Sequence, residues 1–233
     1  MYKRQVQVLW LIYKLEKQAK ENGGKVHFIL GNHEIMNFQG NGGYNQKKYI
    51  KAGQVISQKN EWERAIQFMY SNQTELGNWL RKKNVIEKIG GYIFVHAGLN
   101  PEIVDYNISL NEINNITREN WDEDFYQNPG NNSIANFLIG RKGPFWYRGL
   151  VTDYKYYEKI NESELEKVLK HFKANKIVVG HTVVNNISAD FNGRVIRIDL
   201  KHGTEKKSGF TKGLLIENGI EYIIDDKGEK YEL

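Results

Sequence analysis

Hydrophobic and polar positions follow two different periods along this chain, and the two periods alternate. Residues 6–21 place apolar side chains at helical spacing with lysines and glutamates on the other face, which predicts a helix that ends at Asn22-Gly23-Gly24. An apolar run at residues 25–30 follows and predicts a buried strand. A helix that leads into a strand is typical of an α/β fold.

The middle of the chain predicts a helical insert and a hairpin. Residues 44–82 carry apolar contacts at mostly helical spacing, so we expect an insert that either caps a site or packs only in the core. Residues 85–89 and 92–95 predict two short strands, and Gly90-Gly91 between them is a hairpin signal.

The second half of the chain returns to a helix followed by strands. Residues 162–174 predict a helix, and residues 176–179 predict a buried strand. Residues 187–233 alternate short apolar runs with turn signals, which predicts an antiparallel run that closes a sheet.

Three of these apolar runs stop at polar residues beside a glycine. They end in Gly-Asn-His-Glu at residues 31–34, His-Ala-Gly-Leu at residues 96–99 and Gly-His-Thr at residues 180–182. Taken singly, each is also compatible with an ordinary polar turn. If the strands are neighbours, Asn32, His96 and His181 converge at one sheet edge, where α/β folds build their sites. Two imidazoles and an amide oxygen would form part of a shell for Mn, Fe or Zn.

An aromatic-rich segment at residues 143–149 places Arg148 between a tyrosine and a glycine. The planar fork of an arginine grips two phosphate oxygens at once. The alternative is that Arg148 stacks on Trp146 or Tyr147 as a surface feature.

Composition adds mainly exclusions. The 233 residues are 40% hydrophobic and 26% charged, with a net charge of +5 and no cysteine. Disulfides and thiolate chemistry are therefore excluded. The basic residues are scattered, which favours a solvated surface over a nucleic-acid patch. No apolar run approaches the roughly 20 residues of a membrane helix, so we expect neither nucleic acid nor membrane as a partner. The compartment stays undetermined.

In this order, the three motifs and the segment around Arg148 resemble those of the calcineurin-like metallophosphoesterases. The likeness is closer to the phosphoprotein phosphatase family and its Shewanella-like branch, and it spans about residues 6–203. It implies a four-layer αββα sandwich, with two facing mixed sheets and helices outside. Residues 1–233 would form a single metallophosphatase domain with residues 44–82 as a helical insert or cap.

The resemblance also implies the chemistry. The family hydrolyses phosphomonoesters with two divalent metal ions (Mn, Fe or Zn), by in-line attack of a metal-bridging hydroxide. Asn32, His96 and His181 match the ligands of the second metal. The implied substrate is a phosphoprotein or phosphopeptide, carrying phosphate on Ser/Thr or Tyr.

Three further residues match named roles in that family. His33 matches the general acid that protonates the leaving oxygen. Arg148 matches a phosphate-binding arginine. Glu34 would orient its neighbours rather than bind metal.

One departure from the family pattern is large. The family carries an Asp-x-His motif and a Gly-Asp-x-x-Asp-Arg-Gly motif before Gly-Asn-His-Glu, but this sequence has no aspartate before Asp105. The ligands of the first metal and the bridging carboxylate are thus absent. We therefore expect an N-terminally truncated phosphatase without its first strands, nearly inactive alone and weak in binding divalent metal.

Two other functions remain open at this point. A dinucleoside polyphosphate hydrolase would share the fold and the motifs. A metal-poor pseudophosphatase that acts as a binding module would also lack the carboxylates.

Overall fold

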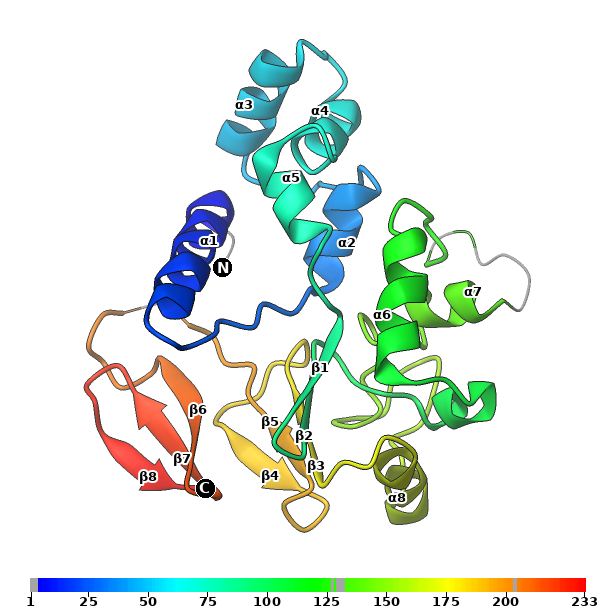
Figure 1. The fold of residues 1–233 in the computed structure, drawn as a ribbon, viewed down its shortest axis with the longest axis vertical. Coiled ribbons are helices and arrows are strands. Elements are labelled where there is room, and N and C mark those ends of the chain that lie inside the picture. The colour runs from blue at the N-terminus through cyan, green and yellow to red at the C-terminus, as the bar shows by residue number, and fades with distance from the viewer. Residues whose placement is uncertain (1–3, 127, 129–132, 203–204) are drawn as a thin grey trace. The chain divides into compact units, whose positions relative to one another are not determined.

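The computed structural model describes residues 4–126, 128, 133–202 and 205–233 (Figure 1). Its contacts divide the chain into two compact units. The sheet unit comprises Lys88–Leu110 and Arg141–Leu233, and the helical unit comprises Tyr2–Glu87 and Asn111–Gly140. The expectation of one metallophosphatase domain over residues 1–233 stays a prediction.

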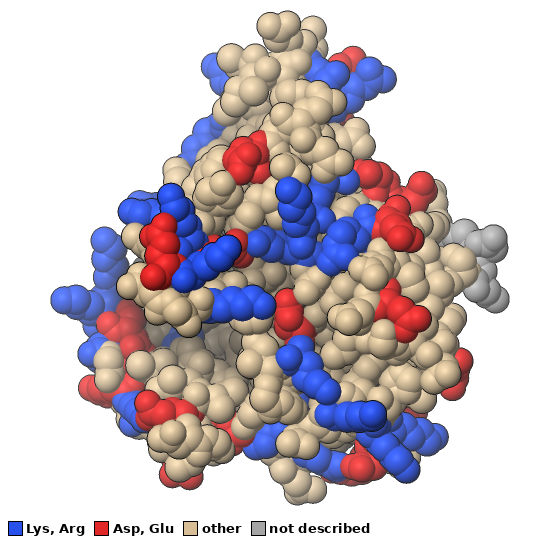
Figure 2. All heavy atoms as spheres, viewed as in Figure 1, with Lys and Arg blue, Asp and Glu red and all other residues tan. Residues whose placement is uncertain are grey.

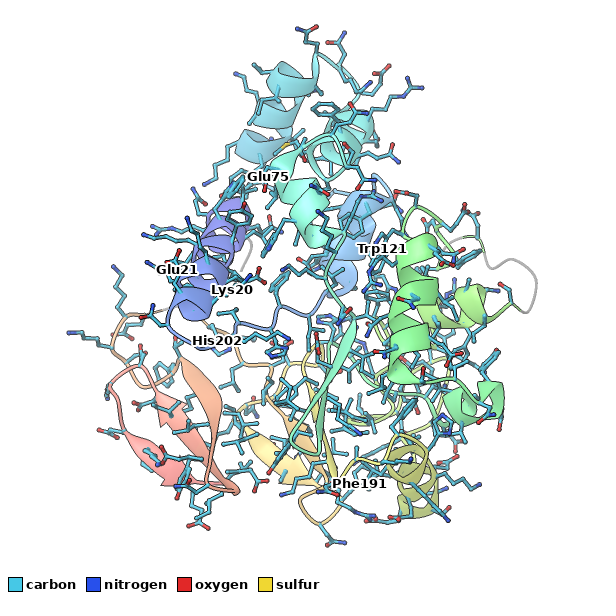
Figure 3. The ribbon with its side chains drawn as sticks, viewed as in Figure 1. Lys20, Glu21, Glu75, Trp121, Phe191 and His202 are labelled. Carbon is cyan, nitrogen blue, oxygen red and sulfur yellow. The ribbon has the colours of Figure 1, made fainter. Side chains whose placement is uncertain are left out.

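The helical unit begins with the helix that the sequence predicts. This helix, α1, spans Gln5–Glu21, and Asn22 caps it before Gly23 turns the chain at a φ of +75°. The carboxylate of Glu16 accepts hydrogen bonds from Trp79 Nε1 at 2.8 Å and from Lys83 Nζ at 2.6 Å. These contacts fasten α1 to the residues in and just after α5, whose first turn holds Glu75 (Figure 3).

The prediction of a strand at residues 25–30 is wrong. The segment makes one parallel bridge, between Ile29 and Asn84. The ladder does not continue, because the N–H of Ile86 donates to the Asn114 side chain at 3.3 Å instead of to a neighbouring strand. A hydrophobic pattern identifies a buried extended segment but does not reveal a side chain that takes its hydrogen-bond partner.

Helices occupy the rest of this unit. Those in the described residues are α2 (Asn32–Phe38), α3 (Lys47–Ser57), α4 (Trp62–Met69), α5 (Glu75–Leu80), α6 (Leu110–Glu119) and α7 (Ile134–Ile139). The predicted insert thus contains α3, α4 and α5, and Thr74 caps α5 by accepting from the N–H of Gly77 at 3.1 Å. Trp121 (Figure 3) packs on Phe38 with ring centroids 5.6 Å apart. The role of the insert as a cap stays a prediction.

A five-stranded sheet organises the sheet unit, in the order β1-β2-β3-β5-β4. The strands are β1 (Ile86–Ile89), β2 (Tyr92–Val95), β3 (Lys176–Val179), β4 (Ser188–Asp190) and β5 (Val195–Arg197). Strands β2 and β3 are parallel, with Val95 opposite Val179. Gly90 and Gly91 turn the chain between β1 and β2 at φ values of +57° and +94°, as the hairpin signal predicted.

The tail is only partly the antiparallel run that we expected. Strand β5 pairs in parallel with β3 and antiparallel with β4. A separate antiparallel sheet follows, in the order β6-β7-β8. Its strands are β6 (Lys212–Glu217), β7 (Ile220–Asp225) and β8 (Lys230–Glu232). The expectation failed for β5, because short strands with turn signals between them have the same sequence pattern whether the neighbouring strand is parallel or antiparallel.

The two sheets share a hydrophobic core. Val178 and Ile196 of the larger sheet pack in one buried cluster with Ile223 of the smaller one. Helix η1 (Pro101–Tyr106) and α8 (Glu162–His171) complete the unit. The α/β fold class is therefore confirmed. No helix in the described residues is long and apolar enough to cross a bilayer.

Candidate active site

Two histidines meet at the carboxyl edge of the larger sheet. His96 follows β2 and His181 follows β3, and the parallel register of these strands brings the following residues side by side. His96 Nε2 lies 3.1 Å from His181 Nδ1. The N–H of Gly180 donates to the carbonyl of His96 at 2.9 Å, which holds the two strand ends together.

His181 adopts a rare backbone conformation. Its φ is +61°, in the left-handed region that few residues other than glycine enter. Such a conformation costs about 1–3 kcal/mol and recurs at active sites, and turns and helix ends elsewhere in this chain adopt it as well. The N–H of Thr182 closes a tight turn onto the carbonyl of Gly180 at 2.6 Å. We infer that this turn fixes the direction of the His181 ring.

The imidazole pair fits part of a divalent metal site. Two nitrogens bound to one cation at about 2.1 Å and near a right angle lie about 3 Å apart, and the two rings have a separation of 3.1 Å. Imidazole is a good ligand for Mn, Fe and Zn. Among the described residues, no three His, Cys, Asp or Glu side chains gather closely enough to hold an ion. The pair alone would therefore need further ligands.

Arg148 lies beside this pair. Its Nη1 donates to the carbonyl of His181 at 2.9 Å and to the Thr182 hydroxyl at 3.1 Å. Its guanidinium carbon is 5.5 Å from the ring centroid of Tyr154. The alternative of stacking on Trp146 or Tyr147 therefore describes Arg148 less well than a position against the histidine turn.

The segment that carries Arg148 is fixed at several points. The hydroxyl of Tyr157 accepts from the N–H of Arg148 at 2.9 Å and donates to the carbonyl of Trp146 at 3.1 Å. The N–H of Ala97, next to His96, donates to the carbonyl of Pro144 at 3.0 Å. These bonds connect the segment of Arg148 with the segment of His96.

Sequence reasoning assigned no role to three residues around this arrangement. Thr182 and Tyr157 hold Arg148 through hydroxyls, and hydroxyl residues in loops give no distinctive signal. Asp199 is half-buried close behind Gly180, and burial raises the pKa of its carboxyl while His202 and Arg148 oppose that shift. Its place just after β5 was a usable signal, because β5 ends at the same edge as β3.

The other candidate residues lie in the helical unit. Asn32 is the first residue of α2 and is 7% exposed. The carboxylate of Glu34 accepts from the N–H of Gly31 at 2.9 Å and thereby caps the same helix. Burial raises the pKa of the Glu34 carboxyl, and its backbone hydrogen bonds only partly offset this.

His33 is half-buried between the two. Its ring centroid lies 4.9 Å from that of Tyr44. Burial lowers the pKa of His33, which favours the neutral imidazole near pH 7. The predicted convergence of Asn32 with His96 and His181 stays a prediction, as does the role of His33 as general acid.

Comparison with known proteins identifies the family of this chain. The calcineurin-like phosphoesterase family matches residues 4–185. This chain belongs to that family. Calcineurin-like phosphoesterases are metallophosphoesterases, so membership implies divalent metal ions, and the prediction of a hydrolase of phosphoric esters is confirmed at the level of the family.

Similar proteins lie in the Shewanella-like branch. Shewanella-like protein phosphatase 1 of Plasmodium berghei is 30% identical over 73% of this chain and 45% of its own length. Shewanella-like protein phosphatase 2 of Arabidopsis thaliana is 25% identical over 84% of this chain and 58% of its own length. This calcineurin-like chain thus spans about half the length of these two relatives.

A solved structure agrees with this placement. The cold-active protein-tyrosine phosphatase of a psychrophilic Shewanella species has a TM-score of 0.83 and 33% sequence identity. The match covers 97% of this chain and 64% of that one. The resemblance to calcineurin-like phosphatases, and to their Shewanella-like branch, is therefore confirmed.

Proposed function

We propose that this chain carries part of the active site of a metal-dependent phosphomonoester hydrolase that acts on phosphoproteins. The observation that supports it most is the imidazole pair of His96 and His181, with Arg148 bonded to the same turn. The proposed metal ligands and the proposed phosphate-binding arginine are thus neighbours in the sheet unit.

Each of these side chains has a definite task in the proposal. His96 and His181 bind a divalent cation together with the amide oxygen of Asn32. Within the described residues, hydrogen bonds engage only Nη1 of the Arg148 guanidinium, so Nε and Nη2 can bind phosphate oxygens. When bound, divalent ions neutralise phosphate charge and lower the pKa of a bound water.

His33 is the proposed general acid. It must carry a proton to give one to the leaving oxygen, yet burial lowers its pKa. A carboxylate beside the ring would favour the protonated form. The family places that carboxylate in a motif that this sequence does not contain before Asp105. We therefore propose that the chain alone has little activity.

The proposed substrate is a phosphoprotein. Similar proteins are named protein phosphatases, and the similar solved structure is a protein-tyrosine phosphatase. A panel of phosphotyrosine peptides, phosphoserine peptides and dinucleoside polyphosphates tests the class. Cleavage of the dinucleotides alone would reject the proposal in favour of the alternative hydrolase.

Metal binding tests the first step without any need for turnover. Calorimetric titration with Mn²⁺ should show weak binding to the chain. We expect His96→Ala and His181→Ala each to weaken it at least about tenfold, because each removes a nitrogen ligand. His171→Gln is the matched control, since this histidine bonds to the carbonyl of Ile108 instead. Unchanged binding in both alanine variants would reject the ligand assignment.

An activity assay tests the proposed hydrolysis and the role of His33. The chain joined behind a segment that carries the Asp-x-His and Gly-Asp-x-x-Asp-Arg-Gly motifs of the family should gain Mn²⁺-dependent phosphatase activity. His33→Ala should then lower kcat by about 100-fold or more, which is typical of a lost general acid. His27→Ala is the control. Full activity in the His33→Ala variant would contradict the acid assignment.

A further inference from the structure

A basic cleft lies among the helices of the helical unit. Its volume is about 460 Å³, and it is lined by residues from the α3–α4 loop, α4, the α4–α5 loop, the end of α5 and the segment after α6. The lining residues that matter here are Lys59, Arg64, Gln67, Asn72, Arg81 and Asp122. The site assignments above use none of these residues.

Arg81 forms a fixed wall of the cleft. Its Nε donates to the carbonyl of Tyr70 at 2.9 Å, and its guanidinium carbon lies 4.6 Å from the ring centroid of Phe38. Nη1 and Nη2 donate to the two carboxylate oxygens of Asp122 at 3.1 and 2.6 Å. Asp122 is the one acidic residue among the described lining residues, and this bidentate pair takes up its charge.

The other two cations of the cleft are not paired with a carboxylate among the described residues. Lys59 and Arg64 are exposed, and neither makes an ion pair in the described part of the chain. Three cations against one carboxylate leave the lining with a charge of +2. Acidic residues close in sequence to the lining, Glu61, Glu63, Glu123 and Asp124, do not themselves line the cleft.

Neutral donors surround these charges. Gln67 lies one turn after Arg64 on α4, so both face the same side of the helix. Among the described residues, the side-chain amides of Gln67 and Asn72 make no hydrogen bond. Phe68 adds a half-buried apolar surface. Lys and Arg side chains also gather over α1 and around the C-terminal end of α5 (Figure 2), which extends the positive potential of the unit.

We propose that this basic cleft binds an acidic segment of a protein. Small-molecule sites are mostly apolar and enclose their ligand, but this lining is polar and its two uncompensated cations are exposed. Carboxylates of an extended segment would pair with Lys59 and Arg64, and the amides would bond to its backbone. That the protein is the phosphorylated substrate, held here while its phosphate is cleaved elsewhere, rests on the function proposed above.

Binding of a labelled hexaglutamate peptide tests the proposal. Fluorescence anisotropy with the whole chain, in a buffer with EDTA, measures it without metal or turnover. The double variant Lys59→Gln/Arg64→Gln should weaken binding about tenfold, which equals about 1.4 kcal/mol. Lys14→Gln/Lys20→Gln is the matched control, because it removes two exposed positive charges from α1 of the same unit; it should change binding less than twofold. Circular dichroism confirms that both variants fold.

Each other outcome overturns the proposal. Equal losses in the two variants would mean general attraction to a basic surface. Absence of binding would mean that the cleft does not recognise acidic chains. Displacement of the peptide by inorganic phosphate at equal concentration would mean a site for small anions. The binding assay involves no catalysis, so peptide binding would stand even if the chain proved to have no phosphatase activity. If the chain proved to be an active phosphatase but bound no peptide, only the inference about the cleft would be refuted.

Discussion

The segment that carries Arg148 depends on the absence of a side chain at Gly149. A Cβ at this position would lie 2.2 Å from the hydroxyl oxygen of Tyr147 and 2.4 Å from its Cζ. Tyr147 is 2% exposed, and its ring centroid is 4.6 Å from that of Tyr157, so the ring has no space into which to move. Gly149→Ala must therefore shift either the ring or the backbone beside Arg148.

The cost of this shift follows from the closeness of the contact. Overpacking a well-filled interior typically costs about 1–3 kcal/mol. For a chain of this size, about 1 kcal/mol lowers the Tm by about 2–4 °C. We expect Gly149→Ala to lower the melting temperature, followed by circular dichroism, by about 3–10 °C. Because Tyr147 and Gly149 touch, Tyr147→Leu/Gly149→Ala should be more stable than the sum of the two single changes predicts.

The same substitution elsewhere in the sheet unit provides the control. At Gly213 in β6, the nearest atom to an added Cβ is Ile224 Cγ2 at 3.9 Å, which is an ordinary contact. Gly213→Ala should leave stability unchanged or raise it slightly, because alanine has less freedom in the unfolded chain. If Gly149→Ala and Gly213→Ala melt at the same temperature, or if the double variant shows additive losses, the steric argument is wrong.

Two further predictions concern stability. Asn114→Ala should lower the free energy of unfolding, measured in urea, by about 2–4 kcal/mol. The Asn114 side chain makes three hydrogen bonds to the backbone at and just before β1, and its removal leaves those backbone groups buried without partners. The control Asn111→Ala, at an exposed position of the same helix, should change stability little, and equal effects of the two variants would contradict the assignment. The hydrogen bond from Lys159 holds the pKa of Asp190 below its usual value despite burial. The ionised Asp190 therefore stabilises the fold at pH values above the unfolded pKa of about 4, and this stabilisation is lost as the pH falls through the lower pKa of the folded state. Asp190→Asn should therefore be less stable than the natural chain at pH 7 and equal to it well below pH 3, and a gap that persists in acid would count against this.

The sequence pattern identifies the imidazole pair because two apolar runs end at a histidine beside a glycine. Whether these runs are adjacent is a property of strand order, which a crossover connection through α8 decides. The 3.1 Å separation depends further on the register of Val95 with Val179 and on the positive φ of His181. None of these can be read from hydrophobic periodicity.

The errors have equally specific causes. The segment at residues 25–30 is extended but does not form a strand. The reason is that the Asn114 side chain accepts hydrogen bonds from the N–H groups of the neighbouring Val85 and Ile86. Asn114 lies far along the sequence, on α6. The contacts of Arg148 with Thr182 and Tyr157 likewise join residues distant in sequence, and no local rule connects them.

The protonation states of the candidate residues bear directly on the activity that we propose for this chain. Two imidazoles bind a divalent ion without neutralising its charge, which limits affinity. Burial lowers the pKa of His33, which favours the neutral imidazole near pH 7, and the carboxylate of Glu34 accepts from the N–H of Gly31. In the proposed site, metal binding and proton donation therefore share one deficit, because no carboxylate is assigned to the imidazole pair or to His33. A single added segment with aspartates should improve both, by completing the metal ligands and by raising the pKa of His33. An added segment that strengthened Mn²⁺ binding but left the pKa of His33 low would show that the two deficits are separate.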